Sequence, residues 1–273
     1  LAFALLALLL SSPKLHAQTN WNETLKAVAS DRAEADVFGR SVSINGNYAI
    51  VGAYNEDNSG NRYNGAGAAY LFERNTTTGN WSEVQKIVAS DRAIQDGFGS
   101  SVSISGNYAI VGARYEDEDA NGQNTKSQAG SAYIFERNAT NGNWSEVQKI
   151  VASDRDGNDR FGLSVAISGN YAIVGAPEED EDASGQSPKR DAGSAYILER
   201  DATTGNWSEV QKIVASDRAR DDWFGWSVSI SGDYAIVGAR VEEEDASGQN
   251  TKFNAGSAYL FERNATTGTW SEV

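Results

Sequence analysis

Residues 98–113 read FGSSVSISGNYAIVGA, and this stretch decides the fold. Serine alternates with valine and isoleucine over residues 101–105, which is the two-residue period of a β-strand with one apolar face. Residues 108–111 are apolar on both faces, as in a strand that is covered on both sides. Gly106 and Asn107, between the two runs, tolerate positive φ and favour a tight turn. The stretch therefore predicts a β-hairpin.

Closely similar stretches occur four times in the chain of 273 residues. Three markers share one register: the Phe-Gly pair, a Gly-Ala pair that follows it, and a tryptophan. The Phe-Gly pairs start at Phe38, Phe98, Phe161 and Phe224, which are 60, 63 and 63 residues apart. The tryptophans are Trp21, Trp81, Trp144, Trp207 and Trp270. The chain is therefore an internal repeat, with copies that start near residues 38, 98, 161 and 224.

Each copy contains four short β-like runs and shows no helical periodicity. In the second copy the runs are residues 101–105, 108–112, 131–136 and 144–152. Four antiparallel strands in about 60 residues, repeated without linkers, are typical of one blade of a β-propeller. A β-solenoid would use a much shorter coil, and tandem sandwiches would need longer units. We therefore expect an all-β chain, a β-propeller built of four-stranded antiparallel blades.

The two ends of the chain differ from the repeat. Residues 1–17 begin with the apolar run LAFALLALLL and predict a signal peptide that is incomplete at its N-terminus, so we expect a secreted or cell-surface protein. Residues 18–273 hold the repeats. Residues 21–29 copy the fourth strand without the first three, which suggests a strand that closes a propeller ring. The last copy stops at Val273, where the others continue into QKIVASDR, so we expect it to be truncated.

The charge balance argues against several classes of function. Asp and Glu number 38 against 23 Lys and Arg, which gives a net charge of −15. This charge argues against a nucleic-acid partner and against docking on anionic lipids. The chain has no cysteine, and its one histidine, His16, lies in the predicted signal peptide. The mature protein would thus lack a thiolate nucleophile, a Ser-His-Asp triad and His or Cys metal ligands, and no membrane insertion is expected after signal cleavage.

The repeated residues resemble the FG-GAP repeat of integrin α-subunit head domains and of many secreted bacterial proteins. FG is the Phe-Gly pair, and GAP is complete at Gly175-Ala176-Pro177. The resemblance covers residues 21–273 and implies a seven-bladed propeller, which at this repeat length needs about 440 residues. About four of the seven blades would then be present. Integrins carry a calcium loop between FG and GAP, but here that stretch is a hairpin without carboxylates, so the family's calcium residues do not carry over.

A different acidic loop follows each Gly-Ala pair. Oxygen-bearing side chains recur at its positions 1, 3 and 5 with Gly at position 6, a pattern that suits Ca²⁺. The candidate ligands are Asp117, Asp119 and Asn121; Asp180, Asp182 and Ser184; and Glu243, Asp245 and Ser247. At position 12, where a bidentate acid would close the site, only the third copy has an acid, Asp191. The alternative is a solvated acidic turn whose side chains accept hydrogen bonds from its own backbone.

Two further patterns each allow two interpretations. Before each Phe-Gly pair stands an Asp-Arg dipeptide, with a second acid five residues after the Asp. The acid pairs are Asp31 and Asp36, Asp91 and Asp96, Asp154 and Asp159, and Asp217 and Asp222. They either serve acid–base chemistry or order the loop, and their repetition in every copy favours the second. Trp223 and Trp226 form either a ligand platform or additional core packing.

Strand alternation places the acidic loops and the Asp-Arg loops on the same face of the propeller. These loops hold most of the variation between copies, which is typical of a recognition surface. We therefore expect a non-enzymatic binding or adhesion module whose acidic loop face contacts a protein or carbohydrate at the cell surface, with weak Ca²⁺ binding. The alternatives are the propeller portion of a larger secreted enzyme, and a propeller with its own carboxylate-based hydrolase or lyase site.

Overall fold

The structure is a computed structural model that describes residues 23, 25–57, 65–245, 247–249 and 251–273. Every regular element in these residues is a β-strand. None of the described segments is a helix of the length and apolarity needed to cross a membrane. The predicted signal peptide, residues 1–17, lies outside the described residues.

The strands form four separate antiparallel sheets, each made of four strands in chain order. Blade 1 consists of β1 (Ser41–Asn45), β2 (Tyr48–Ala53), β3 (Ala68–Arg74) and β4 (Trp81–Ile87). Blade 2 consists of β5 (Phe98–Ser105), β6 (Tyr108–Ala113), β7 (Ser131–Arg137) and β8 (Trp144–Ile150). Blade 3 consists of β9 (Ser164–Ser168), β10 (Tyr171–Ala176), β11 (Ser194–Arg200) and β12 (Trp207–Ile213). Blade 4 consists of β13 (Phe224–Ser231), β14 (Tyr234–Ala239), β15 (Ser257–Arg263) and β16 (Trp270–Glu272).

This architecture confirms the predicted fold class of an all-β chain with four-stranded blades, four of which are formed by the described residues. The predicted runs of the second copy match β5 to β8 with small shifts. β5 begins earlier than expected because a register shift lets Phe98 pair with Ala113. β8 ends at Ile150, and the buried Ala152 that follows it has left the sheet.

The predicted leading strand, residues 21–29, differs from the structure. Residues 23 and 25–29 are not paired into a sheet, and the rest of that segment lies outside the described residues. Each of the four described blades already has a fourth strand of its own, so the closure of a propeller ring by residues 21–29 stays a prediction. Ala29 is nevertheless buried against the core of blade 1.

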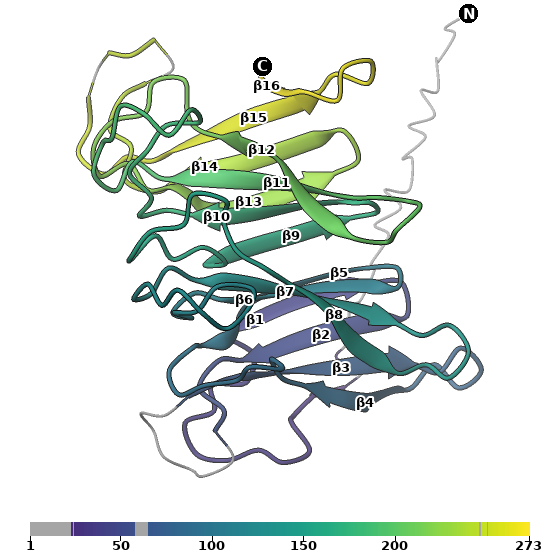
Figure 1. Cartoon of the computed structure of the whole chain (residues 1–273). Coiled ribbons are helices and arrows are strands. Elements are labelled where there is room, and N and C mark those ends of the chain that lie inside the picture. The colour runs from purple at the N-terminus through teal and green to yellow at the C-terminus, as the bar shows by residue number, and fades with distance from the viewer. Residues whose placement is uncertain (1–22, 24, 58–64, 246, 250) are drawn as a thin grey trace, which may run out of the picture.

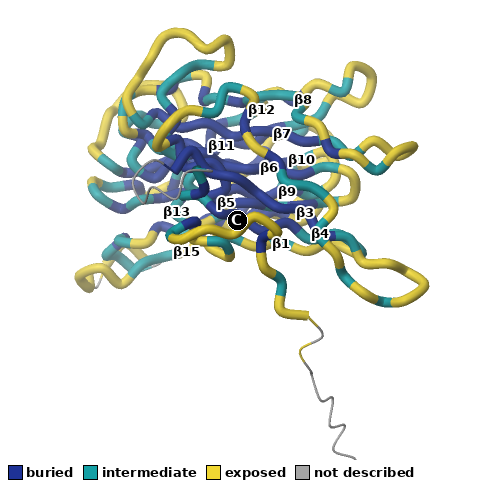
Figure 2. The backbone as a smooth tube through the Cα atoms, turned by 90° about the horizontal axis from the view of Figure 1, so that it is seen from below, coloured by how far each residue is buried: buried dark blue, intermediate teal, exposed yellow. Residues whose placement is uncertain are grey.

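The blades stack face to face in chain order (Figure 1). Each junction encloses an apolar core drawn from both blades; between blades 1 and 2 it includes Ile50 and Leu71 on one side and Val102 and Ile104 on the other. The buried part of the chain therefore runs through the middle of the molecule, while the loops and turns at both ends of the strands are exposed (Figure 2). Each fully buried side chain of this size contributes about 1.5–3 kcal/mol.

The repeated glycines explain why the two motifs recur together. A Cβ on Gly112, from the Gly-Ala pair of blade 2, would lie 2.0 Å from the carbonyl oxygen of Gly162, from the Phe-Gly pair of blade 3. The hydroxyl of Ser101 donates a hydrogen bond of 2.7 Å to that same oxygen. A Cβ added to Gly52 would likewise lie 2.0 Å from the carbonyl oxygen of Gly99, and one added to Gly175 would lie 2.0 Å from that of Gly225. Only glycine permits this approach of backbones, so the two motifs form one contact between blades.

The two outer faces of the stack keep the apolar residues that other blades bury. Val42 and Ile44 of β1 are 68% and 66% exposed, whereas the corresponding Val102 of β5 is 7% exposed. On blade 4, Ile236 and Leu260 are 41% and 52% exposed. The outer faces therefore have the composition of a blade junction without the second blade.

Candidate binding face

Two sets of loops leave the strands on one side of the stack, at the left of Figure 1. The first set joins the second and third strands of each blade and is called the acidic loops, residues 54–67, 114–130, 177–193 and 240–256. The second set precedes the Phe-Gly pairs and is called the Asp-Arg loops, residues 30–37, 88–97, 151–160 and 214–223. Short hairpin turns occupy the opposite side. The predicted placement of both loop sets on one face agrees with the structure.

Backbone hydrogen bonds connect the acidic loop of one blade to the Asp-Arg loop that leads into the next. The amides of Asn158 and Arg160 donate to the carbonyl oxygens of Ser127 and Gln128 at 2.8 and 3.1 Å. The next residue, Phe161, donates to Ala129. The loop face is therefore a continuous hydrogen-bonded surface across this junction, which gives its side chains defined positions.

In the acidic loops, the acid at position 3 folds back on its own backbone. Asp119 Oδ1 accepts hydrogen bonds from the amides of Asn121 and Gln123 at 2.8 and 3.0 Å. Asp182 Oδ1 accepts from the amide and the hydroxyl of Ser184 at 2.9 and 2.6 Å, and these bonds, with that of Gln186, lower the pKa of Asp182 to about 2.

Asp245 Oδ1 is bonded by Ser247 in the same way as Asp182 by Ser184. This turn geometry is the alternative that the sequence offered for these loops.

The acid at position 1 closes the far end of the loop. Asp117 Oδ1 accepts from the amide of Gln128 at 2.6 Å, and Asp180 Oδ1 accepts from the amide of Asp191 at 2.7 Å. In the fourth copy, the backbone oxygen of Glu243 accepts from the amide of Lys252. Among the residues that the structure describes, no three His, Asp or Glu side chains gather around a common metal position. Calcium binding by these loops therefore stays a prediction.

The Asp-Arg dipeptide ties two neighbouring blades together. Asp91 accepts hydrogen bonds from Tyr133 and Lys149 of blade 2, at 2.9 and 2.6 Å. Arg92 extends to blade 1 and donates to Glu56 at 2.8 Å.

Arg155 likewise donates to the backbone oxygen of Asp117 in the preceding acidic loop, at 2.6 Å. In the second, third and fourth dipeptides, the Asp therefore contacts the following blade and the Arg contacts the preceding one.

The second acid of each pair orders its own loop. Asp96 Oδ2 accepts from the amide of Ala93 at 2.6 Å, and Asp36, Asp159 and Asp222 make the same contact. Burial raises the pKa of Asp96 to about 7, that of Asp159 to about 8 and that of Asp222 to about 6. The geometry thus matches the loop-ordering interpretation of the acid pairs.

A buried glutamate in each blade escaped the sequence analysis. Glu116 and Glu179 are 4% and 1% exposed, and each contacts a lysine of its own blade, Lys149 or Lys212, directly. The hydroxyl of Ser131 also donates to Glu116 at 2.8 Å. The signal was present in the sequence, because a glutamate stands four residues after the glycine of every Gly-Ala pair: Glu56, Glu116, Glu179 and Glu242. Glu116 and Glu179 are structural, since they neutralise the buried Lys149 and Lys212.

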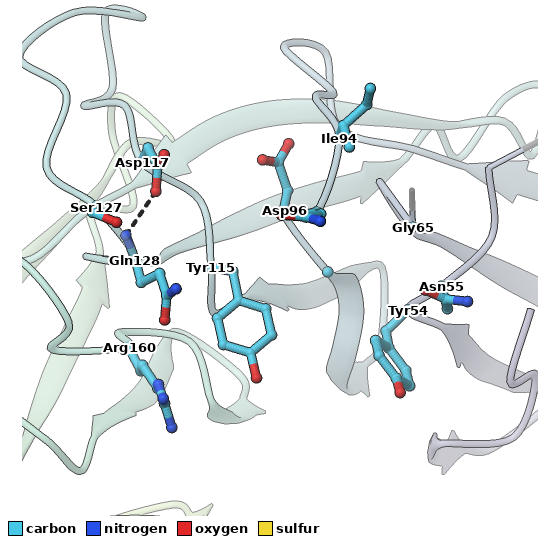
Figure 3. A pocket seen from close by; sticks show the side chains of 12 residues that line it. Tyr54, Asn55, Gly65, Ile94, Asp96, Tyr115, Asp117, Ser127, Gln128 and Arg160 are labelled. Carbon is cyan, nitrogen blue, oxygen red and sulfur yellow. Dashed lines mark hydrogen bonds between the residues drawn. The ribbon is translucent and has the colours of Figure 1, made fainter. Parts of the chain in front are cut away.

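A cavity of about 490 Å³ opens on the loop face between blades 1 and 2 (Figure 3). Its lining includes Tyr54, Asp96, Tyr115, Gln128 and Arg160. In Figure 3, Tyr115 stands near the centre with Tyr54 on one side and Arg160 on the other. The sequence does not predict this cavity, because the cavity depends on side chains from four separate loops.

Trp223 and Trp226 stack on each other, with ring centroids 5.3 Å apart and an interplanar angle of 15°. The guanidinium of Arg240 lies 4.4 Å from the ring centroid of Trp226. Both rings remain partly exposed on the loop face. The pair is thus a surface stack capped by a cation, which leaves the ligand-platform interpretation open to test.

Comparison with known proteins identifies the repeat. The sequence model of the FG-GAP repeat matches residues 21–72, 81–135, 144–198 and 207–261. A search of curated proteins gives no match to the chain. Each FG-GAP match begins at one of the repeated tryptophans and ends in the third strand of a blade. The chain therefore belongs to the FG-GAP repeat family, and its four sheets are blades of an FG-GAP β-propeller.

Proposed function

We propose that this protein is an exported or cell-surface, non-enzymatic binding module that recognises its ligand through the loop face. FG-GAP repeats support a general role as a binding module. The predicted signal peptide supports export. The ligand would be a protein or a carbohydrate of the cell surface.

The observation that carries the proposal is the contrast between strands and loops within one chain. The second strand reads YAIVGA in all four blades. The residue before the repeated phenylalanine, by contrast, is Val37, Gly97, Arg160 or Trp223. The fold needs the same strand in each blade, but it accepts any of these loop residues. The differences on the loop face are therefore free to serve recognition.

The arrangement of the acids supports a binding role over a catalytic one. A general acid and base need carboxylates that reach a substrate. Asp91 instead accepts hydrogen bonds from Tyr133 and Lys149. FG-GAP repeat domains are in general non-catalytic.

The acidic loops favour cationic ligands, and the proposal includes weak Ca²⁺ binding in the third copy. Asp182 and Asp180 each use Oδ1 within the loop, and Asp191, the one acid at position 12, follows on the same loop. The second carboxylate oxygens would be the ligands.

Isothermal titration calorimetry with Ca²⁺ tests this part. Heat at millimolar Ca²⁺ should fall in Asp182→Asn and persist in Asp201→Asn, which alters a similar turn on the opposite face. Absence of heat in the unaltered protein would refute it.

An array of cell-envelope polysaccharides and surface proteins tests the binding function itself. Paired arginine substitutions change the loop face (Ala120→Arg with Ala183→Arg) or the opposite face (Thr77→Arg with Thr203→Arg), and all four positions are exposed. Binding by the unaltered protein that is lost only with the loop-face pair supports the proposal. No binding to the array, or equal loss with both pairs, contradicts it.

A further inference from the structure

We propose that the cavity between blades 1 and 2 is a carbohydrate site that holds one or two neutral sugar rings. This inference rests on the proposed binding function and assigns it a site and a ligand class. A volume of about 490 Å³ lies in the range of small-molecule sites and accommodates rings of this size.

Gly97 leaves room for the cavity beside Tyr115. The other copies carry a side chain at this position, and Val37, Arg160 and Trp223 adopt φ values of 56°, 57° and 58° there. Gly97 has nearly the same backbone, with φ of 69°, but no side chain. A Cβ at Gly97 would point toward Tyr115, 3.5 Å from its Cδ2 atom. Gly97 therefore leaves open the space beside Tyr115 that a side chain at this position would enter.

Two tyrosines line the opened space, and an arginine fixes them. The guanidinium carbon of Arg114 lies 4.6 Å from the ring centroid of Tyr115 and 5.9 Å from that of Tyr54. No salt bridge is formed by Arg114 with the described residues, and its guanidinium packs on the two rings. Rings held in this way offer apolar surface and hydroxyls at defined positions, which suits the C–H face of a pyranose.

Hydrogen-bonding groups line the same cavity. Asp96 is 5% exposed and uses Oδ2 for the amide of Ala93, while Oδ1 has no partner among the described residues. The backbone amide of Gln128 donates to the Asp117 carboxylate, and the side-chain amide of Gln128 remains at the cavity (Figure 3). A carboxylate accepts hydrogen bonds, and a side-chain amide both accepts and donates them, which suits the adjacent hydroxyls of a sugar.

The charges of the cavity favour a neutral ligand over an anionic one. Arg160, its cationic lining residue, is paired with Glu178 at 2.5 Å. Asp96 and Asp117 add acidic groups, and the whole chain carries a net charge of −15. A uronate or a phosphorylated sugar would meet repulsion here, whereas a hexose would not.

Saturation-transfer NMR on the full chain tests the assignment. The probes are maltotriose, cellotriose, mannotriose and chitotriose, with trigalacturonate and trilysine as charged comparisons. We expect signals from at least one neutral trisaccharide and none from trigalacturonate. Gly97→Trp places in the cavity the side chain that Trp223 carries at the same backbone position, and it should weaken binding at least tenfold. Val37→Trp adds the same side chain at an exposed position and should leave binding unchanged.

A second pair of variants distinguishes loss of the site from loss of the fold. Arg114→Gln releases the two tyrosines and should also weaken binding, whereas Arg240→Gln, at the matching position of blade 4, should not. Thermal unfolding of each variant verifies the fold. Absence of a signal from every neutral trisaccharide overturns the inference, as does binding that survives both Gly97→Trp and Arg114→Gln. Binding of trilysine alone overturns the sugar assignment and leaves the proposed binding function standing.

Discussion

Replacing Gly112 by alanine tests the contact that joins the blades. The added Cβ would lie 2.0 Å from the carbonyl oxygen of Gly162 and 2.9 Å from its carbonyl carbon. Both atoms belong to the backbone of blade 3 and cannot rotate away. Relief requires blades 2 and 3 to separate by more than about 1 Å, which removes packing along the junction. Overpacking of a buried site costs about 1–3 kcal/mol, and we expect the upper end of that range or more.

The chain supplies a matched control in Gly238. It stands in the same heptapeptide, YAIVGAR, in blade 4. There a Cβ would meet the Ser227 hydroxyl at 2.5 Å, a group that can rotate, and no backbone atom closer than 3.8 Å. Gly238→Ala should therefore cost less than about 1 kcal/mol.

Urea unfolding followed by tryptophan fluorescence and circular dichroism measures both variants, and thermal scans give a second estimate. At about 2–4 °C per kcal/mol, Gly112→Ala should lower the Tm by about 6–12 °C, and Gly238→Ala by much less. Equal effects of the two substitutions would refute the argument that the Phe-Gly and Gly-Ala pairs meet across the junction.

Three further predictions concern charge, pH and the outer faces. Lys149→Met leaves buried carboxylates unpaired and should cost about 3–5 kcal/mol in urea unfolding, whereas Lys86→Met should cost less, because that side chain is 23% exposed against 6%. A similar cost for both would contradict the role of burial. Asp159 keeps its proton up to about pH 8 when folded but loses it near its ordinary pKa of 3.8 when unfolded, so the folded state binds more protons and the stability falls as pH rises from 5 to 8. Asp159→Asn should flatten that fall in urea midpoints measured at pH 5, 6.5 and 8; an unchanged slope would count against the buried carboxyl. Val42→Ser with Ile44→Ser should reduce concentration-dependent association in sedimentation velocity without lowering the Tm, since both side chains are mostly exposed. Unchanged association would show that the outer face of blade 1 is not the surface through which the molecules associate.

The fold was predictable because its signals are local and are repeated in every copy. Two-residue alternation and the Gly-Asn turn define the first hairpin of each blade. Both signals depend only on residues that are adjacent in the sequence. The role of residues 21–29 could not be decided from the sequence, because a segment pairs as a strand only where a sheet edge is open to it. Residues 23 and 25–29 pair with none of the four described sheets, and ring closure by this segment stays a prediction.

The site was less predictable because side-chain direction is set by the tertiary structure. Asp119 has the spacing of a cation ligand, but the structure turns Oδ1 toward its own loop amides. Glu116 could have been found from its repetition, yet only burial distinguishes it from the exposed acids near it. The cavity at Gly97 depends on an absent side chain and on rings from two blades, which no single motif contains.

The central claim is that the loop face binds the ligand, and the lack of cysteine allows a direct measurement. A single cysteine at Ala120 on the loop face, or at Thr77 on the opposite face, can carry a polyethylene glycol chain of a few kilodaltons. Binding to the surfaces identified on the array is then measured by biolayer interferometry for both conjugates. The account predicts that attachment at Ala120→Cys abolishes binding and that attachment at Thr77→Cys leaves it intact. Full binding by the Ala120→Cys conjugate together with loss in the Thr77→Cys conjugate would contradict the claim.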